Sequence, residues 1–185
     1  MPTSIQHKYI GKKENINIIP RLINKYKRYL AFESHLQTYI VQIIGRGINK
    51  TLDSILLNGS TMEWLGNEVS CGVGMQRIDV MLSTTLNERR LVTPIELKAV
   101  EASERNVNQI QRYVDWLEQY YIPNRISDIQ PVLIAKKTMD KTTHAFKVIL
   151  DGFAAFNAIN SRCLTLKYIE YELIDNDLRF ISIYY

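Results

Sequence analysis

The chain has 185 residues, of which 46% are hydrophobic and 23% are charged, values typical of one globular domain with a substantial core. No apolar run approaches the roughly 20 residues of a membrane-spanning helix, and the sequence begins without a signal-peptide core. Two cysteines, Cys71 and Cys163, are too few for a disulfide framework or a four-cysteine iron–sulfur site and lack zinc spacing. We therefore expect an intracellular, cytoplasmic protein without membrane contact.

The net charge of +4 is unevenly distributed. Residues 1–50 contain nine Lys or Arg and two acidic residues, a balance of +7, which leaves −3 for residues 51–185. A basic end on a nearly neutral body predicts a polyanionic partner such as DNA, although a solvated helix face would explain the excess equally well. The candidates for nucleic-acid contact in this basic part are Lys25, Arg28 and Arg46.

We expect residues 1–60 to form a basic, helical N-terminal part. Apolar residues recur at helical spacing from Arg21 to Ile44, after a proline suited to a first helical turn at position 20. The pattern predicts one long helix, or two helices that break near Ala31. Glu33 lies beside the apolar stripe, either as a partly exposed acid or as an acid that faces a site.

Residues 77–98, with the sequence RIDVMLSTTLNERRLVTPIELK, predict a β-hairpin with a polar turn at Asn87 and Glu88. A preceding strand is expected around Glu68. The first strand of the hairpin alternates, so its apolar positions share one face and Asp79 projects from the other. These apolar positions are Ile78, Val80 and Leu82.

The register of this hairpin brings charges together. With the turn centred between residues 87 and 88, Asp79 faces Glu96, and Arg77 faces Lys98, on one side of the sheet. Two carboxylates about 5 Å apart repel each other, so this arrangement predicts a cation between them. Oxygen ligands suit Mg²⁺ or Mn²⁺. The alternative is the solvated outer face of an ordinary hairpin.

A helix is expected over residues 104–119, and Gln109 and Tyr113 share one of its faces because they are four residues apart. Gln109 could instead take part in capping the start of this helix. The further expected elements are a buried strand over 129–135, a helix over 143–159 and a C-terminal β-hairpin within 161–185.

The sequence of Asp79 followed by Glu96-Leu97-Lys98 resembles the D…ExK signature of the PD-(D/E)XK nuclease superfamily. Together with the Arg-Ile-Asp-Val strand and the helix of Gln109, it is most similar to the NucS/EndoMS and RecB-type nuclease domains, over residues 65–135. The resemblance implies an α/β fold with a restriction-endonuclease-like core, in which a central mixed β-sheet is flanked by α-helices. This core would occupy residues 61–160 of a single domain.

The resemblance also implies a metal-dependent DNA endonuclease that hydrolyses phosphodiester bonds. Asp79, Glu96 and the carbonyl group of Leu97 would bind Mg²⁺ (or Mn²⁺). Lys98 would orient the attacking water and stabilise the developing negative charge.

Other residues of the expected site come from neighbouring elements. Glu33 would hold a second metal or an outer water, and Glu68 is the alternative third acid. Gln109 would hold a metal-bound water or a phosphate, and Tyr113 would contact the nucleic-acid backbone. Arg77 is a further candidate for contact with nucleic acid.

The sequence departs from NucS/EndoMS in two places. Its first 60 residues do not resemble the N-terminal nucleic-acid-binding domain of that family, and Met75-Gln76 stands where a glycine usually precedes Arg-Ile-Asp. A mismatch, a flap, a Holliday junction or a restriction site therefore all remain candidate substrates. The alternatives are a Holliday junction resolvase and an inactive nucleic-acid-binding module with a nuclease-like fold. Symmetric duplex cutting needs two active sites, which a homodimer would provide.

Overall fold

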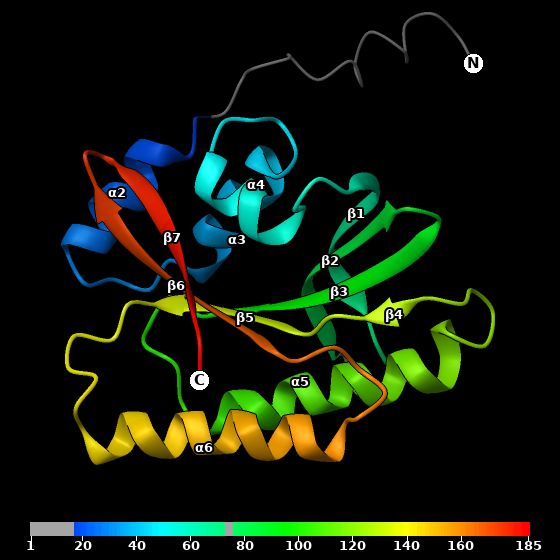
Figure 1. Ribbon diagram of the computed structural model, residues 1–185. Coiled ribbons are helices and arrows are strands. Elements are labelled where there is room, and N and C mark those ends of the chain that lie inside the picture. The colour runs from blue at the N-terminus through cyan, green and yellow to red at the C-terminus, as the bar shows by residue number, and fades with distance from the viewer. Residues whose placement is uncertain (1–16, 73–75) are drawn as a thin grey trace, which may run out of the picture.

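The structure, a computed structural model, describes residues 17–72 and 76–185 and has a mixed seven-stranded β-sheet at its centre (Figure 1). The strands are β1 (Thr61–Ser70), β2 (Arg77–Leu86), β3 (Arg89–Leu97), β4 (Asp128–Ile129), β5 (Val132–Lys136), β6 (Lys167–Ile174) and β7 (Asp177–Ile183). Their order is β1-β2-β3-β5-β6-β7, and the short β4 also pairs with β3. Strands β3, β5 and β6 are parallel, whereas β1, β2 and β3 are antiparallel, as are β6 and β7. This is the α/β fold that was expected.

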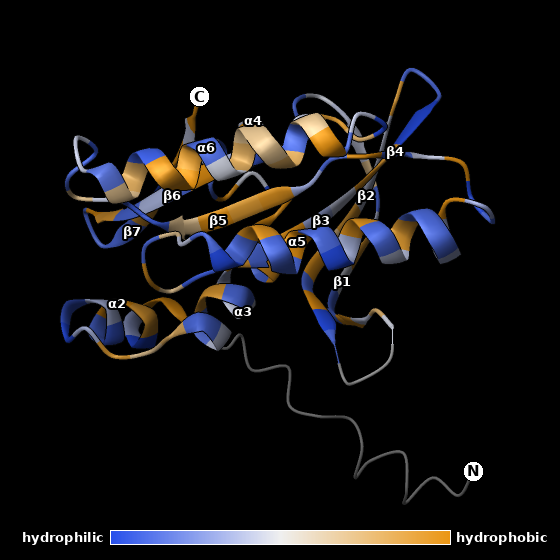
Figure 2. Ribbon diagram, turned by 90° about the horizontal axis from the view of Figure 1, so that it is seen from below, coloured by the Kyte–Doolittle hydropathy of each residue, from blue (hydrophilic) through white to orange (hydrophobic). Residues whose placement is uncertain are grey.

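Helices cover both faces of the sheet. They are α2 (Ile19–Lys27), α3 (Glu33–Ile43), α4 (Lys50–Leu56), α5 (Arg105–Trp116), its π-helical continuation Leu117–Tyr121, and α6 (His144–Ile159). Helices α2, α3 and α4 lie on one face, and α5 and α6 lie side by side on the other (Figures 1 and 2). In the described part of the chain, none of the helices combines the length and apolarity needed to cross a bilayer.

A hydrophobic core lies on each side of the sheet. The first contains Leu36 and Ile40 of α3 against Val80 of β2. The second contains Ile110 of α5 and Phe153 of α6. Because both faces are covered, the sheet has no solvated outer face at this hairpin, and the alternative interpretation of residues 77–98 is wrong.

The register of the central hairpin is confirmed. Leu86 pairs with Arg89, and the ladder continues in step to Val80 opposite Ile95. The turn residues Asn87 and Glu88 have positive φ angles of 48° and 66°. A turn with both central residues left-handed matches the twist of the flanking strands, so the local sequence determines this pairing.

The predicted alternation fails at the beginning of β2. Ile78 packs in the core of α5 and α6, whereas Val80 and Leu82 pack in the opposite core, so these three residues do not share one face. The ladder with β3 ends at Val80, and the side chain of Asp79 instead accepts a hydrogen bond from the N–H of Leu97 at 2.8 Å. The strand therefore changes its orientation at Asp79.

The predicted opposition of Arg77 and Lys98 is also wrong. Arg77 pairs with Ser70 of β1, and the backbone N–H of Lys98 donates to the carbonyl of Ile134 in β5 at 2.8 Å. The ladder between β2 and β3 ends at Val80 and Ile95, and beyond this point β3 remains paired with β5 alone among the described strands.

Most of the remaining elements lie where they were expected. The N-terminal helical pattern breaks between Lys27 and Glu33, around the predicted position of Ala31. Helix α6 begins after Thr143, whose hydroxyl accepts a hydrogen bond from the N–H of Phe146 at 3.2 Å. The basic residues within 1–16, and Met75, lie outside the described residues.

Candidate active site at the end of strand β3

Glu96, Leu97 and Lys98 lie at the carboxyl end of β3. Strand β5 is parallel to β3, so the same edge of the sheet also receives the end of β5 at Lys136. The carboxyl ends of parallel strands are the usual ligand-binding edge of an open α/β sheet. The structure thus brings the predicted Glu-Leu-Lys sequence to an edge that is suited to binding.

An ion pair joins the charged side chains of this segment. Lys98 Nζ lies 2.5 Å from Glu96 Oε1 and 3.5 Å from Glu33 Oε1. Glu33 Oε2 also accepts a hydrogen bond from the N–H of Ala99 at 3.4 Å. The first residue of α3 is therefore held against the end of β3, and Glu33 lies beside Lys98 and Ala99.

Asp79 reaches the same place from β2. Burial raises the pKa of its carboxyl group to about 7, and the charge of Glu96 adds to the increase. The hydrogen bond from Leu97 and the charge of Lys98 oppose the increase without cancelling it. Asp79 is thus a carboxyl group that titrates close to neutral pH.

Glu96 is fully buried, with 0% of its surface exposed. Burial raises the pKa of its carboxyl group, although the interactions with Lys98 and Tyr113 lower it in part. For Lys98, burial alone lowers the pKa, but the adjoining carboxylates, Glu96 above all, outweigh it and leave the pKa raised. Lys98 is therefore a cation at neutral pH and acts by its positive charge, since it has no lone pair with which to accept a proton.

Tyr113 of α5 contacts Glu96 on the face of the sheet that α5 covers, and Gln109 contacts Tyr113. The Tyr113 hydroxyl lies 2.6 Å from Glu96 Oε2 and 2.7 Å from the carbonyl oxygen of Arg77, and it accepts a hydrogen bond from Gln109 Nε2 at 3.0 Å. Its single proton can serve only one of the two acceptors at a time. Tyr113 is only 1% exposed, so it orients Glu96 and the expected contact with a nucleic-acid backbone does not fit its position.

Gln37 is a member of this network that the sequence analysis missed. Its Nε2 donates to the carbonyl of Asp79 at 2.6 Å and to Glu68 Oε1 at 2.9 Å. Gln37 follows Glu33 by four residues on α3, so both side chains project from one face of the helix toward the sheet. That spacing is the signal that could have identified it.

Glu68 and Arg77 lie at the outer side of the site. Arg77 Nη1 forms an ion pair with Glu68 Oε2 at 3.2 Å, and both side chains are about half exposed. Among the residues that the structure describes, Glu68 is linked to Asp79 through hydrogen bonds of Gln37, whereas Glu33 contacts Lys98 directly. Of the two alternatives for the third acid, the geometry favours Glu33.

The three basic residues predicted to contact nucleic acid are placed differently. Lys25 Nζ donates to the carbonyl of Ala31 at 3.2 Å, in the loop that leads into Glu33. Arg28 follows α2 and is exposed. Arg46 follows α3 at the end opposite to Glu33, about 16 Å along an eleven-residue helix. Lys25 is therefore close to the site, and Arg46 is remote from it.

The donor set fits a divalent cation of the Mg²⁺ type. Within residues 17–72 and 76–185, no group of three or more His, Cys, Asp or Glu side chains could hold a metal ion. The predicted set has only two carboxylates, Asp79 and Glu96, and Mg²⁺ is usually bound through one or two carboxylates with water and substrate oxygens. Glu96 Oε1 is paired with the Lys98 ammonium group at 2.5 Å, so a metal ion at this oxygen would share it with Lys98 or displace the ammonium group.

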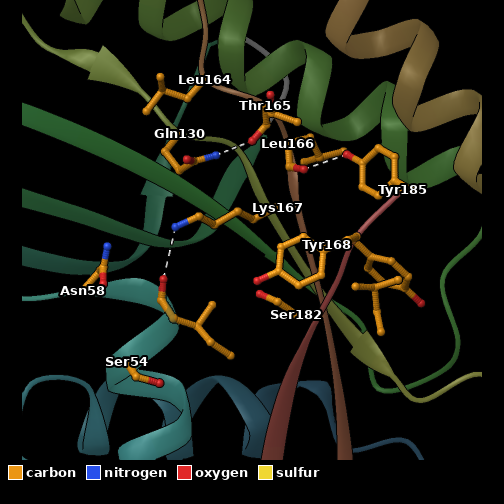
Figure 3. Close-up of a pocket in the computed structure, with 13 residues that line it drawn as sticks. Ser54, Asn58, Gln130, Leu164, Thr165, Leu166, Lys167, Tyr168, Ser182 and Tyr185 are labelled. Carbon is orange, nitrogen blue, oxygen red and sulfur yellow. Dashed lines mark hydrogen bonds between the residues drawn. The ribbon is translucent and has the colours of Figure 1, made fainter.

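Two cavities of about 710 Å³ lie at opposite ends of the parallel strands. The first lies between α4 and the beginning of β6, where Lys167 Nζ donates to the carbonyl of Ile55 and Gln130 Nε2 donates to the carbonyl of Thr165 (Figure 3). Its lining contains no residue of the candidate site. The second is lined in part by Glu33 and Ala99 and so adjoins the site.

The comparisons with known proteins give similarity at the level of the fold. No family model matches the sequence, and no curated protein matches it. Three similar solved structures are EndoMS in complex with double-stranded DNA (19% identity, TM-score 0.42, covering 76% of this chain and 46% of that one), EndoMS in the apo form (16%, 0.37, 76% and 47%), and SfsA of Pyrococcus furiosus in complex with Ca²⁺ (13%, 0.37, 80% and 62%). The chain spans about half the length of the EndoMS chains it matches. It is an α/β protein with a mixed seven-stranded sheet and helices on both faces.

Proposed function

We propose that the protein is a metal-dependent endonuclease that hydrolyses phosphodiester bonds in DNA. The observation that carries this proposal is the fully buried carboxylate of Glu96 with the Lys98 ammonium group 2.5 Å away, at the sheet edge where Asp79 bonds to Leu97. A buried charge cluster with shifted pKa values is costly for the fold, and such clusters occur preferentially at functional sites. The D…ExK pattern supports the same function.

Asp79 and Glu96 would hold the metal ion, together with the carbonyl group of Leu97. The chemistry that bound Mg²⁺ or Mn²⁺ supplies is acidification of a water molecule and neutralisation of phosphate charge. The protein contributes the position of the two carboxylates. Asp79 is held by the N–H of Leu97 and by Gln37, and Glu96 is held by Tyr113.

Lys98 would bind a non-bridging oxygen of the scissile phosphate and stabilise the charge that develops there. Its raised pKa keeps it protonated for this role. Glu33, which is about half exposed, faces Lys98 from the solvent side and would orient water at the phosphate. Lys25 of α2, whose ammonium group donates to the carbonyl of Ala31 in the adjoining loop, would add positive charge for the DNA backbone.

The test is a cleavage assay on labelled single-stranded, duplex, flap and four-way DNA with Mg²⁺, Mn²⁺ or a chelator. We expect metal-dependent cleavage of at least one substrate, reduced roughly 100-fold or more in Asp79→Asn and Lys98→Met. The control is Arg89→Met, which removes the ion pair with Asp128 (2.6 Å) at the opposite end of β3. Cleavage that persists with chelator, or in Lys98→Met, would contradict the mechanism.

The same gel distinguishes the alternatives. Retardation of DNA without cleavage, in every metal, would identify an inactive nucleic-acid-binding module. Selective cleavage of the four-way substrate would identify a Holliday junction resolvase. The absence of both binding and cleavage would contradict DNA as the partner.

A further inference from the structure

The cavity that adjoins the candidate site is aromatic on one side and charged on the other. It has a volume of about 710 Å³ and lies between the loop that joins α2 to α3 and the segment that follows β3. This volume is within the range of about 300–1,000 Å³ that is usual for small-molecule sites. The residues that matter here are Tyr26, Tyr29, Phe32, Glu33, Ala99 and Lys136.

The cavity and the candidate site share a wall. Glu33 lines the cavity and also lies 3.5 Å from the ammonium group of Lys98. Ala99, which donates its N–H to Glu33, lines the cavity as well. A nucleic-acid strand with a phosphate at Lys98 would therefore have a neighbouring nucleotide at the mouth of this cavity.

Tyr29 is exposed directly after α2, where the N–H of Leu30 donates to the carbonyl of Lys25 and so stabilises a left-handed residue at the helix end. Its ring is 86% exposed, and its φ angle of 54° is in the left-handed region. The neighbouring Leu30 and Val100 are exposed apolar side chains at the same cavity. An exposed apolar cluster beside a candidate active site indicates a surface for a ligand.

Lys136 adds a positive charge over these rings. Its Nζ lies 4.8 Å from the ring centre of Tyr26 and 5.0 Å from that of Tyr29. Its neighbours Lys137 and Lys141 each pair with a glutamate, whereas Lys136 has no carboxylate within 4.0 Å among the residues the structure describes. The ammonium group is thus available for the phosphate of a nucleotide at the mouth of the cavity, while the tyrosine faces suit a flat ring.

The charges of the lining favour a base over a second phosphate inside the cavity. Glu33 and Glu101 would repel an anion but can accept hydrogen bonds from the amino groups of a nucleobase. A paired base is stacked within its duplex and cannot enter a protein pocket, so the occupant must be unpaired.

We propose that this cavity binds one unpaired nucleobase, stacked on Tyr29, next to the phosphate that lies at Lys98. The inference rests on the proposed function, because it takes the ligand of the site to be DNA. The unpaired base can come from a single strand or from a nucleotide extruded from a duplex. In either case, the substrate of the site is DNA with an unpaired nucleotide adjoining the phosphate to be cleaved.

The test is equilibrium binding in the presence of a chelator, so that cleavage plays no part. The probes are oligonucleotides that carry the fluorescent base 2-aminopurine in a single strand, at a bulge in a duplex, or within a fully paired duplex. Stacking on a tyrosine quenches this fluorophore. We expect quenching with the single-stranded and the bulged probe, and tighter binding of whichever of these two the cavity accommodates better. We expect no additional quenching with the fully paired duplex.

The variants are Tyr29→Ala, Tyr29→Phe and, as a matched control, Tyr184→Ala, which removes a tyrosine that is 92% exposed elsewhere. Tyr29→Ala should abolish the quenching and weaken binding roughly 10-fold, whereas Tyr29→Phe keeps a stacking ring and should retain both. Circular dichroism checks that the exposed substitutions leave the fold intact.

Failure of this inference is distinguishable from failure of the proposed function. Quenching that is lost in Tyr29→Ala, in a protein that cuts no DNA, would support the base site and contradict the nuclease. Cleavage by a protein that shows no quenching, or whose quenching persists in Tyr29→Ala, would overturn the base site alone. A protein that binds none of the three probes would overturn it as well.

Discussion

The Lys98 ammonium group lies 2.5 Å from Glu96 Oε1, and Glu96 is the only one of the two that is fully buried. These two residues are two positions apart, so their side chains lie on the same side of the strand, and they form an ion pair at the carboxyl end of β3. Removing one member of a buried pair leaves an uncompensated charge, which costs more than the pair itself contributes.

Lys98→Met should therefore lower the free energy of unfolding by about 3 kcal/mol at pH 8. The loss should be smaller at pH 5, because the raised pKa of Glu96 allows its carboxyl group to take up a proton in the folded state. Urea denaturation at both pH values measures this. Adding Glu96→Gln should recover much of the loss, and an equal loss at both pH values would contradict the explanation.

Asp79→Asn should change the pH dependence of stability. The pKa of Asp79 is raised from 3.8 to about 7, so between these values the folded protein holds a proton that the unfolded chain releases. Stability then falls as the pH rises through this window, by at most about 1.4 kcal/mol per pH unit from this group, and levels off above pH 7. The variant lacks this contribution, so its urea midpoint in chelator should exceed that of the wild type most at pH 8.

Added Mg²⁺ should offset the cost of the two ionised carboxylates at pH 8. A ligand at 100 times its dissociation constant stabilises a protein by about 2.7 kcal/mol, which for a domain of this size raises the melting temperature by about 5 °C or more. A thermal melt with and without Mg²⁺ measures the increase, and chelator should reverse it. An equal increase in Asp79→Asn would show that the ion binds elsewhere.

Gln37→Ala should reduce kcat more than it changes KM. Gln37 Nε2 donates to the backbone carbonyl of Asp79 at 2.6 Å. Without this hydrogen bond, the backbone of β2 at Asp79 is no longer held, and the carboxyl group of Asp79 is displaced. The cost in stability should be about 1–2 kcal/mol. Thr38→Ala is the control, since Thr38 is exposed on the same helix and bonds only to Ser34. A change in KM alone would contradict a positioning role.

Tyr113→Phe should destabilise the protein by about 1–3 kcal/mol, because the buried Glu96 Oε2 loses its hydroxyl partner. Activity should fall as well, since the orientation of Glu96 is no longer held. Tyr168→Phe provides the comparison: its hydroxyl also contacts a buried glutamate, Glu170, at 3.0 Å. That variant should lose stability in urea denaturation without losing cleavage, and parallel losses of cleavage would argue against a specific role for Tyr113.

Local sequence patterns were sufficient for the secondary structure and for the pairing of the central hairpin. The turn at Asn87 and Glu88 fixes which residues of β2 and β3 face each other, because a two-residue turn leaves a single register. The helix break before Glu33 and the cap at Thr143 also depend on neighbouring residues alone. The periodicity of apolar residues and the residue preferences of turns act over a few residues, so both can be read directly from the sequence.

The composition of the site depended on contacts between distant segments. That Ile78 faces the other core and that Tyr113 is buried follow from where α5 packs against the sheet. The ion pair of Arg77 with Glu68 follows from the pairing of β2 with β1. Gln37 lies 42 residues from Asp79 in the chain, and its contact exists only because α3 crosses the strand at that point. The sequence by itself determined the two paired strands that bring Asp79, Glu96 and Lys98 near one another, and it left Glu33 and Glu68 as alternatives for a third acid. Only the tertiary structure decided which neighbours hold them, because helix packing is set by the whole core and leaves no local pattern.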